Sequence, residues 1–105
     1  MDKNEAISIA QRYVTLVSKH FFVEEAILFG SFAKGTHHAD SDIDIAIVFK
    51  SVDDIIDRQI QLLHMRSDDD LIIEPHPFLL NDFNRSNPVV SEILSNGIRL
   101  KNYAA

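Results

Sequence analysis

The chain has 105 residues, a formal net charge of −6 and no cysteine. These values predict one domain over residues 1–105 with a hydrophobic core, and they exclude disulfides and cysteine-ligated zinc. The acidic balance without a lysine or arginine cluster argues against direct binding of DNA or RNA, and no apolar run approaches the roughly 20 residues that span a bilayer, so we expect a cytoplasmic protein.

The first predicted elements are a helix and a strand. The helix begins at a capping box formed by Asp2 and Glu5 and extends to about Phe22. Its apolar side chains recur at helical spacing, at Ala6, Ala10, Tyr13, Val17 and Phe21. The strand covers residues 25–29 and ends in a Gly-Ser turn.

A second strand follows a polar loop over residues 34–41. It is predicted over residues 42–49, where side chains alternate between the two faces of the strand. One face carries Asp42, Asp44, Ala46 and Val48. The other face carries Ile43, Ile45, Ile47 and Phe49. The second set predicts a buried stripe, and the first predicts a strand whose beginning meets a wet, charged site.

A second amphipathic helix is predicted in the middle of the chain. Ser51 and Asp54 have the spacing of a capping box in front of it. The helix then carries Ile55, Ile56, Gln59, Ile60 and Leu63. An acidic turn over residues 68–70 connects this helix to the next strand.

The third strand is predicted over residues 71–78. Pro75 and Pro77 each lack the N–H group that a strand donates to its neighbour. We therefore expect this strand at an edge of the sheet, or we expect it to end early.

The last elements are a helix and a short strand. Asn87 fits the N-cap of the helix, and Pro88 fits its first turn. The helix is predicted to run through Leu94 and to stop at Gly97. A final strand is expected over residues 98–100.

Two carboxylates at the start of the second strand form a candidate metal site. Asp42 and Asp44 share a strand face, with Cα atoms about 6.6 Å apart at roughly 3.3 Å rise per residue. At that separation they can share divalent cations, although an isolated pair is also common at a solvated junction of loop and strand. A calcium loop starting at Asp40 is excluded, because Ile45 replaces the invariant glycine and Ser51 the bidentate glutamate.

The Gly-Ser turn before these acids fits a phosphate group. A glycine after an apolar strand lets backbone approach a ligand closely, and backbone N–H groups at the start of a short helix point at phosphate oxygens. The Ser31 hydroxyl adds a further donor. Taken alone, Gly30-Ser31 is an ordinary turn and Gly35 an ordinary left-handed turn residue. Together with Asp42 and Asp44, the turn predicts a site for a nucleoside triphosphate and divalent metal.

The two motifs resemble the signature of a known superfamily. Gly30-Ser31-Phe32-Ala33-Lys34-Gly35 and Ser41-Asp42-Ile43-Asp44 are similar to the signature of polymerase-β-type nucleotidyltransferases. The short chain, Glu74-Pro75-His76-Pro77-Phe78 and residues 93–100 resemble the minimal branch, the MNT proteins. The resemblance covers essentially the whole chain. It implies an α/β (α+β) fold, the polymerase-β-like palm, in which helices pack on a small mixed sheet.

The resemblance also implies which residues bind nucleotide. These residues are Gly30, Ser31, Lys34 and Ser41. Gly30 and Ser31 would hold the triphosphate of ATP. Lys34 stands where many relatives carry arginine, and a lysine cannot make the forked contact of a guanidinium with phosphate.

Three acids would ligate metal and carry catalysis. Asp42 and Asp44 match the acid pair of the family, which together with a third carboxylate binds two Mg²⁺ ions, with Mn²⁺ as the alternative. Glu74 is our choice for the third acid, because its strand can pair beside the second strand at a spacing of roughly 4.8 Å. Asp68, Asp69 and Asp70 are the alternatives.

The family further implies a partner. The chain shows no second domain to present an acceptor, and MNT proteins pair with a separate helical HEPN ribonuclease. The leading hypothesis is an antitoxin that transfers AMP from ATP to a tyrosine of that toxin. The alternatives are transfer to a small hydroxylated molecule with another subunit or a homodimer, and an antitoxin that neutralises by binding alone.

Four other positions are weaker candidates. His37 and His38 lie in the loop before the acids, where they are either solvated or in contact with phosphate or acceptor. His76 has the same strand parity as Glu74, which predicts either a place near the site or a partly buried structural histidine. Tyr103 is either a modification site or a terminal aromatic that packs or frays.

Overall fold

The computed structural model describes residues 1–100, and Tyr103 lies outside this part of the chain. Within it the helices are α1 (Lys3–Ser18), α2 (Ser31–Lys34), α3 (Ile55–His64) and α4 (Pro88–Asn96). The strands are β1 (Glu25–Phe29), β2 (Ile43–Phe49), β3 (Ile73–Leu79) and β4 (Ile98–Arg99). Short 3₁₀ turns cover Asp68–Asp70 and Leu80–Asp82.

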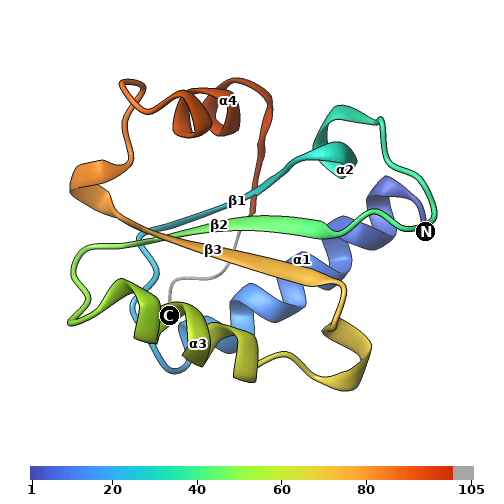
Figure 1. Ribbon diagram of the computed structural model, residues 1–105. Coiled ribbons are helices and arrows are strands. Elements are labelled where there is room, and N and C mark those ends of the chain that lie inside the picture. Colours follow the sequence, from blue (N-terminus) through green and yellow to red (C-terminus); the bar gives the residue numbers. More distant parts are fainter. Residues whose placement is uncertain (101–105) are drawn as a thin grey trace.

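The described strands form one mixed sheet in the order β3-β2-β1-β4. β1 runs antiparallel to β2 and β4, whereas β2 and β3 are parallel. The helices α1 and α3 lie on one side of this sheet and α4 on the other (Figure 1). The predicted mixed sheet packed with helices is therefore confirmed.

The side chains of β2 divide between two clusters, as their alternation predicts. Ile43, Ile45, Ile47 and Phe49 join the large core beneath α1 and α3. Ala46 instead packs with Ile27 and Ile93 in a smaller cluster beneath α4. Because both faces of β2 are covered along most of its length, its charged beginning is the part left open to solvent.

β3 is an edge strand, which confirms one of the two predicted alternatives, and it runs to Leu79 without ending early. The N–H of Ile43 donates to the carbonyl of Ile72. In a parallel ladder this pattern points the even-numbered backbone groups of β3 at β2 and the odd-numbered groups outward. Pro75 and Pro77 thus stand where the missing N–H would face away from the sheet.

α1 begins as predicted but ends before Phe22. The Asp2 carboxylate accepts a hydrogen bond of 2.8 Å from the Glu5 N–H, as expected of the N-cap. The helix stops at Ser18, and Phe21 lies in the following turn, where its ring packs edge-on against Phe49 at 6.1 Å. The turn brings Phe21 onto the end of β2, a contact that a continued helix would not make.

α3 is capped by Asp54, and the predicted capping role of Ser51 is wrong. The Asp54 carboxylate accepts from the backbone N–H groups of Ile56 and Asp57. Leu62 is the fully buried residue of this helix, whereas Ile56 and Ile60 are exposed. The spacing therefore predicted the helix correctly but not which of its apolar residues enter the core.

The C-terminal elements follow the prediction closely. Asn87 caps α4 by accepting from the backbone N–H groups of Val89 and Val90, and Pro88 is the first helical residue. The helix ends at Asn96, next to Gly97. None of the helices within residues 1–100 is long and apolar enough to cross a membrane.

Candidate functional site

Two glycines flank the short helix α2. Gly30 has φ 80° and ψ −153°, a conformation that is essentially restricted to glycine. Gly35 closes the four-residue helix in the left-handed region at φ 76°. Phe32 is buried between them and anchors α2 to the core. The first N–H groups of α2, like those of any helix, have no acceptor within the helix, and the buried Phe32 fixes the position of this helix start.

The carboxylate of Asp44 lies against this turn. Asp44 is the second residue of β2, and its β1 partner is Phe29, the residue before Gly30. A Cβ atom placed on Gly30 would come within 2.4 Å of Asp44 Oδ2. The side chain of Asp44 is 28% exposed, so it reaches solvent beside the turn.

Glu74 is the register partner of Asp44 on the other side of β2. Because paired residues on neighbouring strands share a face, the two carboxylates belong to the same side of the sheet. Asp42 precedes β2 by one position and is exposed. The predicted proximity of the second and third strands is therefore confirmed, and it brings Glu74 beside Asp44.

These acids offer oxygen ligands, which is the chemistry that Mg²⁺ prefers. In the part of the chain that the structure describes, no group of three or more His, Cys, Asp or Glu side chains is arranged to hold a metal ion. Carboxylates without a shared cation repel one another. The donor set therefore fits a divalent cation, but its side chains need to rotate toward each other to bind one.

His76 contacts Asp44. Its Nε2 lies 3.0 Å from Asp44 Oδ1, and its ring packs against Phe29 with centroids 5.1 Å apart. The alternation of side chains along β3 predicted that His76 lies on the same face of the sheet as Glu74. The contact with Phe29 had no signal in the sequence, because it depends on how β1 and β3 lie on either side of β2.

Lys34 and Ser41 are engaged in contacts within the protein. Lys34 Nζ lies 2.6 Å from Glu92 Oε1 on α4, and both side chains are about half exposed. The hydrogen bond from Lys34, with a further one from Asn96, lowers the pKa of Glu92. Ser41 is buried, and its hydroxyl accepts a 2.9 Å hydrogen bond from the His38 N–H. Ser41 thus closes the loop that leads to Asp42.

The two loop histidines have different surroundings. His38 accepts a hydrogen bond from the Asp40 N–H through Nδ1 and stays exposed. His37 stacks on Phe32 at 4.4 Å, with the rings 17° from parallel. Its Nδ1 is buried and has no hydrogen-bond partner among residues 1–100. Both histidines therefore shape the loop between α2 and the acids.

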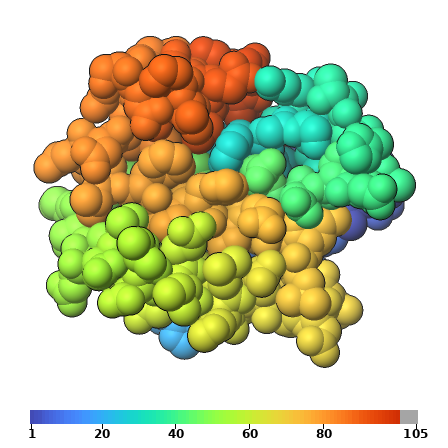
Figure 2. All heavy atoms as spheres, in the orientation of Figure 1, coloured from blue at the N-terminus to red at the C-terminus, as the bar shows by residue number. Residues whose placement is uncertain are grey.

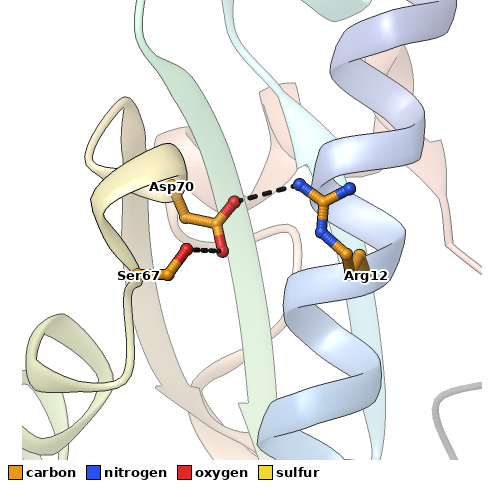
Figure 3. Close-up of polar contacts among 3 residues, drawn as sticks. All are labelled: Arg12, Ser67 and Asp70. Carbon is orange, nitrogen blue, oxygen red and sulfur yellow. Dashed lines mark hydrogen bonds and ion pairs between the residues drawn. The ribbon is translucent and has the colours of Figure 1, made fainter.

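Among the alternative third acids, Asp70 is occupied elsewhere. Its buried carboxylate lies 3.3 Å from Arg12 of α1 and accepts a 3.0 Å hydrogen bond from the Ser67 hydroxyl (Figure 3). Asp68 and Asp69 are exposed in the same turn. The geometry of the turn therefore favours Glu74 over these three acids, since Asp70 joins α1 to the turn instead.

The acids lie at one end of an open face of the molecule. In Figure 2, β3 crosses the middle of this face, with α4 above, α3 below and the α2 turn to the right. A cavity of about 600 Å³ lies toward the end of β3 and is lined by residues that include Phe78, Asn84 and Asn87. Its lining does not include Asp44 or Glu74, which are both partly exposed.

The chain matches one protein-family model and is similar in fold to solved structures. The family model described as Polymerase beta, Nucleotidyltransferase matches residues 11–104. No curated protein matches the sequence. Among solved structures, the chain is similar to a candidate nucleotidyltransferase from Sulfolobus solfataricus, with a TM-score of 0.70 and 22% identity over 92% of this chain and 80% of that one.

A second solved structure is a toxin–antitoxin crystallised with AMP-PNP. The matched chain has a TM-score of 0.54 and 20% identity to this protein, over 97% of this chain and 74% of that one. At these identities the two structures show that the fold is shared, and the family match agrees with them.

Proposed function

Because the chain belongs to the polymerase-β nucleotidyltransferase family, we propose that it transfers a nucleoside monophosphate from a nucleoside triphosphate to a hydroxyl group. The single observation that supports this site most directly is the position of Asp44. One of its oxygens lies against Gly30, and its register partner is Glu74. The acids and the phosphate-binding turn are thereby parts of one surface.

We assign the metal to Asp42, Asp44 and Glu74. Two Mg²⁺ ions bound there, with Mn²⁺ able to replace them, would neutralise the triphosphate and stabilise the attacking and leaving oxygens. Asp42 is exposed and Glu74 is half-buried, so both side chains have the freedom to turn toward Asp44. The acids supply only oxygen ligands, as this ion requires.

The residues of the turn would bind and orient the nucleotide. Backbone N–H groups after Gly30 and the Ser31 hydroxyl donate to phosphate oxygens. Lys34 would move from Glu92 to the triphosphate when nucleotide is bound. Ser41 acts by closing the loop, so that Asp42 lies at the start of β2.

The reaction breaks the phosphoanhydride bond between the α- and β-phosphates and forms a phosphate ester with the acceptor. The acceptor oxygen forms a bond to the α-phosphorus while the bond from that phosphorus to the bridging oxygen breaks and pyrophosphate leaves. The proton of the acceptor hydroxyl goes to the Glu74 carboxylate. The nucleoside monophosphate remains on the acceptor.

For the acceptor, we propose a tyrosine of a partner HEPN ribonuclease toxin, with ATP as the donor, so that the chain acts as the antitoxin. Two observations support this choice. The fold is shared with a chain of a toxin–antitoxin complex, and that complex was crystallised with AMP-PNP. The net charge of −6 favours a protein acceptor over a nucleic acid.

The test is incubation with α-labelled ATP, Mg²⁺ and the product of the adjacent gene, followed by intact-mass analysis. We expect AMP on the partner with the native chain and none with Asp44→Asn. Asp69→Asn is the matched control, because Asp69 is an exposed aspartate outside the site. A stable complex that suppresses toxicity without added mass would show neutralisation by binding alone, and label on a small hydroxylated compound would show the other alternative.

A further inference from the structure

The imidazole of His76 lies across β2. In the register, His76 is the partner of Ala46, two positions along the strands from the pair of Asp44 and Glu74 and on the same face of the sheet. Its ring nevertheless reaches back to Asp44 on β2 and to Phe29 on β1. The side chains of His76 and Phe29 therefore meet on the face of the sheet that carries Asp44.

The register partner of His76 on β2 is the smallest residue in that strand. Ala46 is fully buried, and the residues around it in β2 are isoleucine and valine. A single methyl group at this position leaves space above β2 that a larger side chain would fill. Ala46 therefore allows the His76 ring to lie between Asp44 and Phe29.

The two oxygens of Asp44 have different neighbours. Oδ1 lies 3.0 Å from His76 Nε2, whereas Oδ2 lies on the side of Gly30. An ionised carboxylate only accepts hydrogen bonds, so Nε2 carries the donating hydrogen. The contact fixes the rotation of the carboxylate and leaves Oδ2 beside the phosphate-binding turn.

We infer that His76 is a positioning residue for Asp44: its Nε2–H holds Oδ1, and Phe29 holds the ring, so that Oδ2 faces the Gly30 turn where metal and triphosphate would meet. This inference rests on the proposed function, because it concerns the orientation of a metal ligand. Groups that hydrogen-bond to metal ligands matter for binding, and their removal typically costs about 10–100-fold in metal affinity or activity.

Two amide substitutions of His76 can distinguish the effect of its hydrogen bond to Asp44 from the effect of its ring packing. Glutamine places its amide nitrogen close to the position of imidazole Nε2, whereas asparagine is one methylene too short to reach Asp44. We expect His76→Gln to keep Mn²⁺ affinity within a few-fold of the native chain and His76→Asn to weaken it by about 10–100-fold. His64→Asn serves as the control, because His64 is exposed in the last turn of α3.

The measurement is a Mn²⁺ titration followed by electron paramagnetic resonance, with and without a non-hydrolysable triphosphate, on variants shown to be folded by circular dichroism. Equal Mn²⁺ affinity of the native chain and His76→Asn would overturn the inference. An equal loss of Mn²⁺ affinity in His76→Gln and His76→Asn would also overturn it. If the native chain binds no Mn²⁺, the proposed function and the inference fail together. If it binds Mn²⁺ with an affinity that depends on His76 but transfers no nucleotide, the proposed reaction alone fails.

Discussion

The carboxylate of Asp44 fills the space that a side chain on Gly30 would need, with Oδ2 2.4 Å from the position of a Cβ atom. Gly30→Ala must therefore displace Asp44 or distort the turn. We expect transfer to fall on the order of 100-fold, since a small misplacement at a reacting centre has effects of this size. Initial rates of AMP transfer would measure the loss.

The matched control for Gly30 is Gly35→Ala. Gly35 has nearly the same positive φ, but nothing lies within 4 Å of the place where its Cβ atom would be. This change should cost about 1 kcal/mol of unfolding free energy from backbone strain and leave transfer close to native. Equal losses of activity in the two variants would contradict a specific role of the Gly30 contact with Asp44.

Asp42→Asn and Asp44→Asn should abolish transfer while the fold is retained. Each substitution removes a negative charge from a surface that also carries Glu74, so we expect unfolding free energy in the absence of metal to stay the same or rise. Chemical denaturation without Mg²⁺, paired with the transfer assay, would test both effects. Native turnover by either variant would contradict the assignment of the metal ligands.

Asp70→Ala should lower stability and spare the chemistry. The change leaves Arg12 and the Ser67 hydroxyl without their partner (Figure 3), which should cost about 1–3 kcal/mol of unfolding free energy. The neighbouring Asp69→Ala, at an exposed position, should change it by less than about 0.5 kcal/mol. A folded Asp70→Ala protein that no longer transfers nucleotide would make Asp70, in place of Glu74, the third acid.

Tyr13 should make the protein sensitive to alkali. Burial raises the pKa of Tyr13 above its ordinary value of 10.0, and its hydroxyl donates to the Leu62 carbonyl. The folded state keeps this phenol protonated, whereas the unfolded state releases the proton above pH 10. Its contribution to stability is therefore fully present below pH 10 and declines as pH rises further.

Tyr13→Phe provides the test of that pH dependence. The variant should be less stable by about 1 kcal/mol at neutral pH, because the hydrogen bond to Leu62 is lost. Its unfolding free energy should decline less steeply between pH 10 and 11 than that of the native chain. Identical slopes in urea titrations across this range would show that Tyr13 does not control the alkaline transition.

Glu92→Gln should release Lys34 for nucleotide. The pair joins two half-exposed side chains on α2 and α4, so its loss should leave thermal stability almost unchanged. Calorimetric titration should show tighter triphosphate binding by Glu92→Gln than by the native chain. Glu24→Gln removes a charge at another exposed position and controls for net charge. Weaker binding by Glu92→Gln would mean that Glu92 holds Lys34 in its productive position.

The sequence predicted the elements that rest on local patterns. Alternation along β2 placed Asp44 on one face and Ile45 on the other, and the two prolines predicted that β3 lies at an edge or ends early, of which the edge position is observed. The adjacency of Glu74 and Asp44 followed from pairing the two strands. These features depend on the alternation of side chains along a strand and on the backbone N–H group that proline lacks. Both can be read directly from the sequence.

Contacts that depend on side-chain rotation were not predictable in the same way. The pair of Lys34 and Glu92 joins residues far apart in sequence, and neither residue type is unusual on a helix. The ends of helices were also ambiguous, because Ser51 and Asp54 both fit an N-cap by residue type. The position at which the chain turns after β2 decides whether Ser51 or Asp54 caps α3. That position depends on how α3 packs in the folded protein.

The two prolines of β3 also limit how the sheet can grow. A further strand, whether from another copy or from a misfolded chain, would have to bond to the outer edge of β3, where Pro75 and Pro77 supply no N–H. At the opposite edge, β4 has only two residues. Within residues 1–100, both edges of the sheet are therefore poor templates for an added strand, which disfavours cross-β polymerisation and extension of the sheet by a partner protein.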